Sequence, residues 1–420
     1  MKTMLAAPST DRKDQSAAGT PPIPVVHIIT KLELGGAQQN TLYTVSHLDR
    51  RRFAPYLIAG CGGLLDEEAR RLDGVRLSWV PSLIREIRPW RDLLAWIALR
   101  RRLWRIREEA GPVMIVHTHS SKAGILGRWA AAMAGATAIV HTDHGFGFND
   151  EQPWWLRRFL IWLERLTAQV ADAAIVVSEA NQRLGERLGL FGRGEGKRPS
   201  RPQSRLIRSG IEFSSFRTAG ASEKAAMRKT LGLGPGALVV VTVACLKPQK
   251  APLDLVAVAQ RVAQEMPDVR FVVIGDGELR PAMEAQIDAA RLRDRVALLG
   301  WRRDVPELLQ AADLFLLTSR WEGLPRSILE AMLAGLPVVA TAVDGVGDVV
   351  QDGVNGYLIS AGDVDRIARR VVELLRAPAL RHRMGEAARA LPGEFDIDRM
   401  VRQQEALYLE LLQAKGVAAP

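Results

Sequence analysis

Cysteine is scarce in this chain: among 420 residues only Cys61 and Cys245 are cysteines, and they lie far apart. This count gives no disulfide framework, and the spacing is not that of a cysteine metal site. Long apolar runs are lacking too, since no segment approaches the roughly 18 uninterrupted apolar residues of a membrane-spanning helix. We therefore expect a cytoplasmic protein that is not integral to a membrane.

Apolar residues are also few at the start of the chain. The first 22 residues are polar apart from a short stretch at residues 4–7. That stretch is too short for the hydrophobic region of a signal peptide, so we predict a disordered tail over residues 1–22.

Acidic residues are outnumbered by basic ones, 47 to 57, which gives a net charge of +10. All of the excess positive charge lies in residues 1–217, whereas the remainder is nearly neutral. The apolar fraction of 47% and the charged fraction of 25% are those of an ordinary globular protein. A basic N-terminal half predicts contact with a polyanion or with an anionic membrane surface.

The length of the chain favours two domains, because one hydrophobic core rarely organises so many residues. From Ile23 onward, short apolar runs alternate with amphipathic stretches in two successive series. Strands that alternate with helices are typical of parallel sheets covered on both faces. The pattern predicts an α/β protein with two doubly wound, Rossmann-like domains that face a central cleft.

The expected elements can be placed by residue number. Strands of the first series are expected at residues 24–29, 54–59, 114–117, 138–142, 174–177 and 205–207. Its helices are expected at residues 36–48, 63–72, 91–109, 121–134, 154–170 and 179–189. Strands of the second series are expected at residues 238–243, 270–274, 296–299, 314–317, 338–341 and 356–359.

These series define the expected domains. We place an N-terminal domain at residues 23–217, which includes a flexible basic loop at 192–204, and a C-terminal domain at residues 218–394. The amphipathic segment 395–420 is expected to form a helix that packs back onto the N-terminal domain.

Loops that follow strands hold the candidate binding residues, because ligands of parallel sheets bind beyond the carboxyl ends of the strands. Gly36 lies between the first strand and the first helix, where a glycine admits a ligand and the helix N-terminus offers N–H groups to an anion. In the second series, Lys247 and Lys250 follow a strand where a diphosphate would need positive charge. Gly275 and Gly277 form the turn after the next strand. Taken singly, each could equally be an ordinary turn or a solvated residue.

The segment SRWEGLPRSILE at residues 319–330 carries the stronger signal. It follows the expected strand at 314–317 and opens a helix expected at 327–334, with Glu322 at the turn and Glu330 inside the helix. A carboxylate accepts two hydrogen bonds and so suits vicinal hydroxyl groups. Glutamates for hydroxyl groups, lysine for a diphosphate and glycines for close approach together predict a nucleotide-sugar site.

These motifs resemble the retaining glycosyltransferases of family 4, which have the GT-B fold. Residues 319–341, with seven residues between the two glutamates, are the most specific match; supporting matches are LKPQK at 246–250, VIGDG at 273–277 and LGWRRD at 299–304. The resemblance runs from about Val25 to Leu412. It implies transfer of a sugar from a nucleotide-diphosphate sugar to an acceptor hydroxyl with retention at the anomeric carbon.

The resemblance also implies roles for single residues. Glu322 would contact the donor sugar near its anomeric carbon and His144 would face the reacting sugar, so these two are the catalytic candidates. His144 could equally cap the turn in which it lies. Lys250 would bind the diphosphate and Glu330 the ribose. The complete donor-binding set is Gly36, Lys250, Gly275, Gly277, Gly323, Leu324, Pro325 and Glu330.

The chain departs from the family pattern in two places. Residues 244–246 read Ala-Cys-Leu where the family usually has Gly-Arg-Leu, so the expected phosphate-binding arginine is missing. Lys247, Arg208 or Arg326 could supply that charge, although lysine and arginine are not interchangeable at a bidentate site. Residues 209–211 read Ser-Gly-Ile in place of Asn-Gly-Val.

A metal site is not expected. The Asp-x-Asp motif at 363–365 is interpreted as the start of a surface helix. His117 and His119 are interpreted as turn or acceptor-side residues, because no third ligand with suitable spacing is visible. We expect metal-independent chemistry without a cofactor, in which Lys250 and helix dipoles neutralise the charge on the leaving diphosphate.

Two segments, residues 84–109 and 154–162, combine basic and aromatic residues at helical spacing. Such helices favour a membrane interface, although their apolar faces can also pack inside the protein. We predict membrane contact through Arg100, Arg101, Trp104, Trp154 and Arg157. The acceptor would then be lipid-linked or a polysaccharide of the bacterial cell envelope, and the protein would be peripheral at the inner face of the cytoplasmic membrane.

Other classes of protein remain open at this point. A nucleotide-sugar epimerase with the GT-B fold would consume a nucleotide sugar without an acceptor. A basic nucleic-acid-binding protein would explain the charge but not Glu322 and Glu330, so we expect no nucleic acid partner. A non-catalytic partner subunit is the third alternative. The sugar, the base, the acceptor and the oligomeric state are not set by these patterns.

Overall fold

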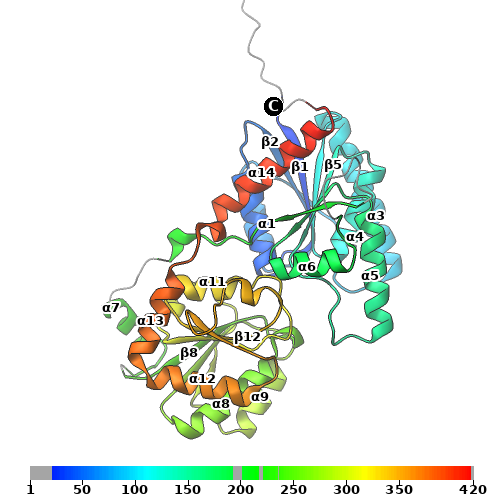
Figure 1. Cartoon of the computed structure of the whole chain (residues 1–420). Coiled ribbons are helices and arrows are strands. Elements are labelled where there is room, and N and C mark those ends of the chain that lie inside the picture. Colours follow the sequence, from blue (N-terminus) through cyan, green and yellow to red (C-terminus); the bar gives the residue numbers. More distant parts are fainter. Residues whose placement is uncertain (1–20, 193–200, 217–220, 235, 418–420) are drawn as a thin grey trace, which may run out of the picture.

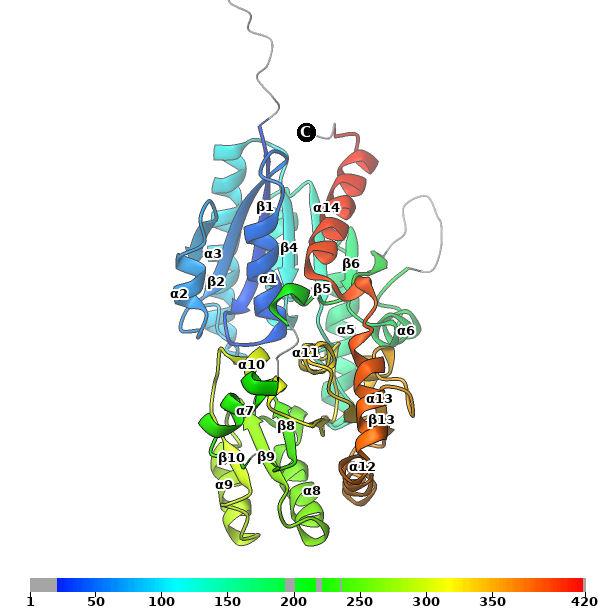
Figure 2. The same cartoon turned by 90° about the vertical axis from the view of Figure 1, so that its left-hand side faces the viewer.

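The computed structural model describes residues 21–192, 201–216, 221–234 and 236–417. They form two α/β domains stacked end to end, each built on a parallel sheet that is flanked by helices (Figure 1). Figure 2 shows the two domains from the side, one above the other, with α11 at their boundary. The predicted fold class, two doubly wound Rossmann-like domains, is confirmed.

The N-terminal domain contains a seven-stranded sheet in the order β3-β2-β1-β4-β5-β6-β7. Its strands are β1 Ile23–Lys31, β2 Phe53–Gly60, β3 Arg76–Trp79, β4 Ile115–His119, β5 Ala138–Asp143, β6 Ala173–Val176 and β7 Gln203–Leu206. Its helices are α1 Gly36–His47, α2 Asp66–Arg70, α3 Pro89–Ala110, α4 Ser121–Met133, α5 Trp154–Ala168 and α6 Glu179–Arg187.

The C-terminal domain contains a six-stranded sheet in the order β10-β9-β8-β11-β12-β13. Its strands are β8 Val239–Val243, β9 Arg270–Ile274, β10 Val296–Leu298, β11 Leu314–Leu317, β12 Val338–Thr341 and β13 Gly356–Ile359. Its α-helices are α7 Ala221–Thr230, α8 Pro252–Glu265, α9 Arg280–Ala289, α10 Val305–Gln310, α11 Arg326–Leu333, α12 Val364–Arg376 and α13 Pro378–Arg389. The chain also forms the 3-10 turns η1 Phe213–Ser215, η2 Pro248–Lys250, η3 Asp344–Asp348 and η4 Gly393–Phe395, and ends in α14 Ile397–Ala414.

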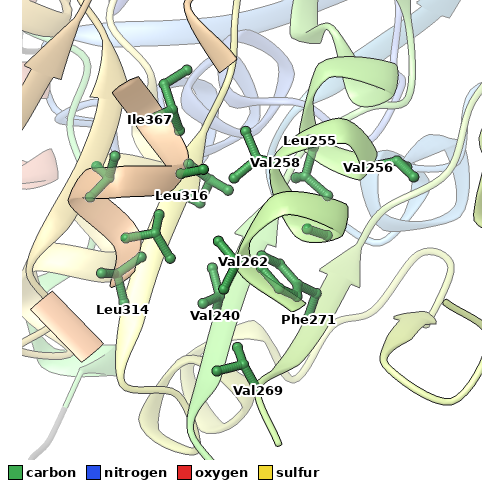
Figure 3. Packing of buried hydrophobic residues seen from close by; sticks show 14 of the residues in the cluster. Val240, Leu255, Val256, Val258, Val262, Val269, Phe271, Leu314, Leu316 and Ile367 are labelled. Atoms are coloured by element: carbon green, nitrogen blue, oxygen red, sulfur yellow. The ribbon is translucent and has the colours of Figure 1, made fainter. Parts of the chain in front are cut away.

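The strands of the C-terminal domain are apolar on both sides because helices cover both faces of the sheet. Val240, Leu314 and Leu316 pack against α8 and α12, as Figure 3 shows. The alternate positions Phe315 and Leu317 pack with residues of α11 on the opposite face. Each such fully buried side chain contributes about 2 kcal/mol to folding.

One face of the N-terminal sheet is covered by the last helix of the chain. In Figure 1, α14 crosses from the C-terminal domain and lies along the N-terminal domain, where the chain ends. Met400, Val401 and Tyr408 of α14 are buried together with Val25 of β1 and Ile115 of β4. The N-terminal domain is therefore completed by the C-terminal end of the chain.

Several expected elements differ in detail from the structure. The short edge strand β3 was not predicted, because only four partly exposed residues form it. β4 continues to His119, two residues beyond the predicted end. Gln203 and Ser204, predicted to lie in a flexible loop, pair with β6 as the start of β7. Two predicted segments lie outside the described residues: residues 1–20 of the tail and residues 193–200 of the loop.

No helix in the described ranges combines the length and the apolar character that crossing a bilayer requires.

Candidate active site between the domains

Loops of the two domains touch directly at the carboxyl ends of β5 and β11. A Cβ atom on Gly145 would lie 3.4 Å from the backbone nitrogen of Gly323, and one on Gly323 would collide with the carbonyl oxygen of His144. Only glycine fits at position 323, because the backbones approach so closely. The contact places His144 of the first domain beside the turn that carries Glu322.

Glu322 lies in this turn between β11 and α11, and only 6% of its surface is exposed. Its carboxylate forms an ion pair with Lys250 and accepts a 2.5 Å hydrogen bond from the hydroxyl of Ser319. The backbone N–H of Glu322 donates to Asp344 at 2.7 Å. Because β8 and β11 are neighbours in the sheet, the loops after them bring Glu322 and Lys250 together across 72 residues of sequence.

Lys247 adds a second positive charge beside Lys250. Partial burial lowers the pKa of the Lys247 ammonium, and the charge of Lys250 lowers this pKa further. Two ammonium groups that repel each other would gain free energy from an anion between them. Among the described residues, Lys247 has no carboxylate within ion-pair distance.

The two arginines named as sources of phosphate charge are already bound to other side chains. Arg208 is buried and pairs with Asp348, with Glu179 at 3.3 Å and with Glu394 at 3.8 Å. These carboxylates lie on α6, η3 and η4, so the guanidinium group of Arg208 connects these three elements.

Arg326 lies in the first turn of α11, at the boundary between the domains. It donates to the side-chain oxygen of Gln39 at 2.8 Å and pairs with Glu330 at 3.5 Å. A Cβ atom on Gly36 would lie 2.9 Å from its Cδ atom. Arg326 thus fills the space in front of Gly36 and joins α11 to α1.

Glu330 lies within α11, one turn after Arg326. Burial raises the pKa of its carboxyl group, whereas the nearby guanidinium of Arg326 acts in the opposite direction. Leu324 is buried in the core beneath the turn, so only its backbone is available to a ligand. Pro325 is the residue that precedes the first turn of α11 and has an extended backbone.

Close backbone packing explains why glycine occurs at positions 275 and 277. Gly275 has a φ of +131°, and a Cβ atom there would collide with the carbonyl oxygen of Ala244. A Cβ atom on Gly277 would lie 2.5 Å from the carbonyl oxygen of Leu246. The loop after β9 thus packs against the loop that carries Lys247, which accounts for both glycines with or without a ligand.

The structure adds a buried group of histidines that the sequence did not reveal. His27 of β1 pairs in register with His117 of β4, and His119 follows two residues later on the same face. Ring nitrogens of these three residues lie within 4.8 Å of one another. His117 and His119 were interpreted as turn or acceptor-side residues, and their placement in a turn was wrong because both are buried in β4. The alternation of β1 would have revealed His27, had the strand order been known.

Hydrogen bonds connect these histidines to His144. The Nδ1 atom of His119 lies 3.2 Å from Nε2 of His144, and its Nε2 atom lies 2.9 Å from Nδ1 of His27. His117 instead contacts the hydroxyl of Tyr408 at 2.6 Å and that of Thr142 at 2.7 Å. Burial lowers the pKa of His27 to about 3 and that of His144 to about 4.

The predicted membrane residues lie on the surface of the N-terminal domain. Trp154 is 74% exposed and Trp104 is 55% exposed, and Arg100 and Arg101 are exposed as well. Arg157 is partly buried and pairs with Asp150 at 3.1 Å. Further large apolar side chains of the two predicted segments, 84–109 and 154–162, are exposed on or just before α3 and on α5: Ile87, Trp90, Leu93, Leu94, Trp155, Phe159 and Trp162.

Comparison with known proteins identifies the family. Residues 34–192 match the family described as Glycosyltransferase Family 4, and residues 223–391 match Glycosyl transferases group 1. The Escherichia coli UDP-Gal:alpha-D-GlcNAc-diphosphoundecaprenol alpha-1,3-galactosyltransferase is 31% identical over 397 residues, which cover 94% of this chain and 98% of that protein. The putative glycosyltransferase EpsD of Bacillus subtilis is 28% identical over 70% of this chain and 76% of its own length.

A solved structure agrees at the level of the fold. The Anabaena protein HepE, in complex with UDP and glucose, superimposes with a TM-score of 0.76 at 22% identity, covering 92% of this chain and 99% of HepE. Together, the two facing Rossmann-like domains and these relatives define a glycosyltransferase of the GT-B class. The chain belongs to glycosyltransferase family 4.

Proposed function

We propose that this glycosyltransferase moves a sugar from a nucleotide-diphosphate sugar to a hydroxyl group of a lipid-linked acceptor, with retention at the anomeric carbon and without a metal ion. The observation that carries the proposal is the buried pair of Glu322 and Lys250 at the contact between the domains. The Escherichia coli relative is named for a UDP-sugar donor and a diphosphoundecaprenol acceptor, which makes a UDP-sugar and a polyprenyl-diphosphate sugar the first substrates to test.

The residues suggest how the reaction proceeds. The acceptor oxygen attacks the anomeric carbon from the face that the diphosphate leaves, and its proton passes to a phosphate oxygen of the leaving group. Negative charge then grows on the diphosphate, and Lys250, Lys247 and the N-terminus of α11 supply fixed positive charge to stabilise it. Glu322 holds hydroxyl groups of the donor sugar and orients the anomeric carbon. Lysines in this role support chemistry that is independent of a metal.

The exposed tryptophans support a membrane-bound acceptor. α5 begins at Trp154, directly after the loop that starts at His144 and touches the second domain at Gly145. In that loop Glu151 lies 3.7 Å from Arg320 of the second domain. The exposed ring of Trp154 thus lies on the segment next to the active site. Aromatic residues among arginines fit the interface of an anionic membrane, which would place the protein at the inner face of the cytoplasmic membrane during cell-envelope glycan synthesis.

The proposal is tested by incubating the purified protein with a panel of nucleotide sugars and vesicles that contain polyprenyl-diphosphate N-acetylglucosamine. We expect nucleotide release only when the acceptor is present, an unchanged rate in EDTA, and a product whose new glycosidic bond has the anomeric configuration of the donor. Release of nucleotide without any acceptor would instead favour an epimerase or hydrolase, and an inverted product would contradict the retaining mechanism.

A further inference from the structure

Three neighbouring strands align a row of histidines that ends at the active site. β1, β4 and β5 are adjacent, and they contribute His27, His119 and His144 in that order, with His144 directly after β5. The rings are joined by two nitrogen-to-nitrogen hydrogen bonds of 2.9 and 3.2 Å. His27 is at one end, completely buried, and its Nε2 atom has no hydrogen-bond partner among the described residues.

All three rings are neutral at pH 7. Burial is the main cause of the low pKa of each, and it lowers the pKa of His119 well below its usual value. Two further groups act on His144: His141 lowers its pKa and Asp143 raises it. Asp143 also lies 3.3 Å from His141.

Neutral rings leave only two ways to make both hydrogen bonds. A neutral imidazole carries one N–H, so His119 donates at one nitrogen and accepts at the other. In the first arrangement each ring donates toward the active site, and His144 carries its proton on Nδ1. In the second each ring donates away from the site, and His27 carries a proton on its buried Nε2.

The end of the row distinguishes the two arrangements. In the second, the N–H at Nε2 of His27 is buried without an acceptor, and orphaned buried N–H groups are rare in proteins because their desolvation is costly. In the first, that nitrogen holds only a lone pair. The Nδ1 atom of His144 has no partner among the described residues and is not among the buried unpaired atoms, so it can meet a ligand.

From this geometry we infer that His27 and His119 are positioning residues that hold His144 as the tautomer with its proton on Nδ1. His144 then serves as a neutral hydrogen-bond donor to an oxygen of the bound substrate and does not act as a base. This role in catalysis rests on the proposed function, whereas the tautomer itself does not.

A metal ion is the competing explanation for three clustered histidines. However, every ring nitrogen of His27, His117 and His119 except Nε2 of His27 already takes part in a hydrogen bond. A divalent cation would displace several of these hydrogen bonds. It would also be buried among neutral rings, and a charge buried without an opposite charge is costly. The hydrogen-bonded row therefore accounts for the geometry better than a metal site.

The tautomer can be measured directly in the intact chain. Protein with 15N-labelled histidine is studied by long-range 1H–15N correlation NMR at pH 7, and the His144 signals are assigned from their loss in His144→Ala. We expect the bonded proton on Nδ1 of His144, His119 and His27. A proton on Nε2 of His144 in the wild type, or stoichiometric metal in the purified protein, would overturn the inference even if sugar transfer is active.

Variants connect the tautomer to activity. His119→Ala removes the hydrogen bond to His144, so His144 should return to the Nε2–H form that dominates in solution. The kcat should then fall about 10- to 100-fold, with the donor KM nearly unchanged. His27→Asn keeps an N–H donor near the position of Nδ1 and should retain most of the activity, whereas His27→Leu should not. Tyr408→Phe is the matched control, because Tyr408 is equally buried but contacts only His117 of the group.

The outcomes separate the two proposals. If no sugar transfer is found but His144 carries its proton on Nδ1, only the proposed function fails. If His119→Ala remains folded, as judged by its melting temperature, and keeps the wild-type tautomer and kcat, the positioning role is wrong.

Discussion

At the scale of single residues, Glu322 carries the charge on which the proposed chemistry depends most. Glu322→Gln preserves the shape and can still accept a hydrogen bond from Ser319, but it removes the negative charge opposite Lys250. We predict a loss of about 100-fold or more in kcat, the magnitude typical of removing one electrostatic group from an active site. Lys250→Met should instead weaken binding of the nucleotide diphosphate. Steady-state kinetics and calorimetric titration with UDP measure the two effects.

Both variants leave a charge unpaired in a partly buried site, so lost stability must be separated from lost chemistry. The Arg228–Asp313 pair in the same domain, at 2.6 Å, provides a matched control. Asp313→Asn should lower the melting temperature comparably while the folded enzyme retains its kcat. Normal activity in folded Glu322→Gln would contradict the assigned role.

The buried histidines should make the protein sensitive to acid. The pKa of His27 is about 3 in the folded chain, against an ordinary value of 6.5, so only the unfolded chain takes up this proton between these values. The free energy of unfolding should therefore fall as the pH drops below about 6.5, by about 2 kcal/mol at pH 5 for His27 alone. His117 and His119 shift in the same direction.

Urea unfolding at pH 7 and pH 5 checks this expectation. His382→Gln provides the control, since it removes an exposed histidine and leaves the buried group in place. A free energy of unfolding that stays constant from pH 7 to pH 5 would show that these histidines are not buried in their neutral form.

Sequence reasoning identified Glu322 and Lys250 because each lies in a short motif whose chemistry is local. It did not identify His27, since that residue reaches His119 across 92 positions of sequence and only through the strand order. It also named Arg208 and Arg326 as residues that could supply charge to the phosphate. The ion pair of Arg208 with Asp348, 140 positions away, leaves no mark in the sequence. A charged residue therefore indicates a binding site only when the side chains that pair with it are known.

At the scale of elements, the turn between β11 and α11 depends on the absence of a side chain at Gly323. Gly323→Ala would bring a methyl group against the carbonyl oxygen of His144 and push the two loops apart. We predict a loss of about 100-fold in sugar transfer, because a displacement of about 1 Å is sufficient for such an effect. Gly347→Ala is the control, since a Cβ atom there has no neighbour within 4 Å. Equal activity of the two variants would show that the contact is dispensable.

The amphipathic helix α3 should contribute to membrane binding. Leu99 and Leu103 are buried in the core, whereas Arg100 and Arg101 are exposed. The double change of these arginines to Gln should weaken binding to anionic vesicles by about 30-fold, since each basic residue near such a surface contributes about 1 kcal/mol.

Vesicle sedimentation at fixed ionic strength measures this effect. The matched control is the double change of Arg366 and Arg369 to Gln, because these arginines are exposed on α12 of the other domain. If both pairs weaken binding equally, net charge and not the surface of α3 is responsible.

Most elements were predictable because their signals are local. Buried parallel strands appear as continuous apolar runs, as in LFLL of β11, and those of the second domain were placed to within about one residue. The strand β3 was missed because RLSW is short, partly exposed and lies at an edge of the sheet. Helix ends shifted by a few residues, since caps and tertiary contacts decide where the last turn closes.

At the scale of the whole molecule, the chain crosses between the domains twice, and the two crossing segments are hydrogen-bonded to each other. The backbone N–H of Ile211 donates to Phe395 at 2.9 Å, and that of Ile397 donates to Ile211 at 3.1 Å. Arg208 lies close to the first crossing in sequence and binds carboxylates on α6, η3 and η4. The alternation of strands and helices predicted both sheets, but it could not predict this junction, which depends on residues almost 200 positions apart.

We propose that Glu322 and Lys250 hold an activated sugar where the two domains meet. A crystal structure of the chain with a bound UDP-sugar tests it most directly. We predict a sugar hydroxyl within about 3 Å of the Glu322 carboxylate and a phosphate oxygen at a similar distance from Lys250. A sugar bound away from both side chains, with their ion pair intact, would contradict it.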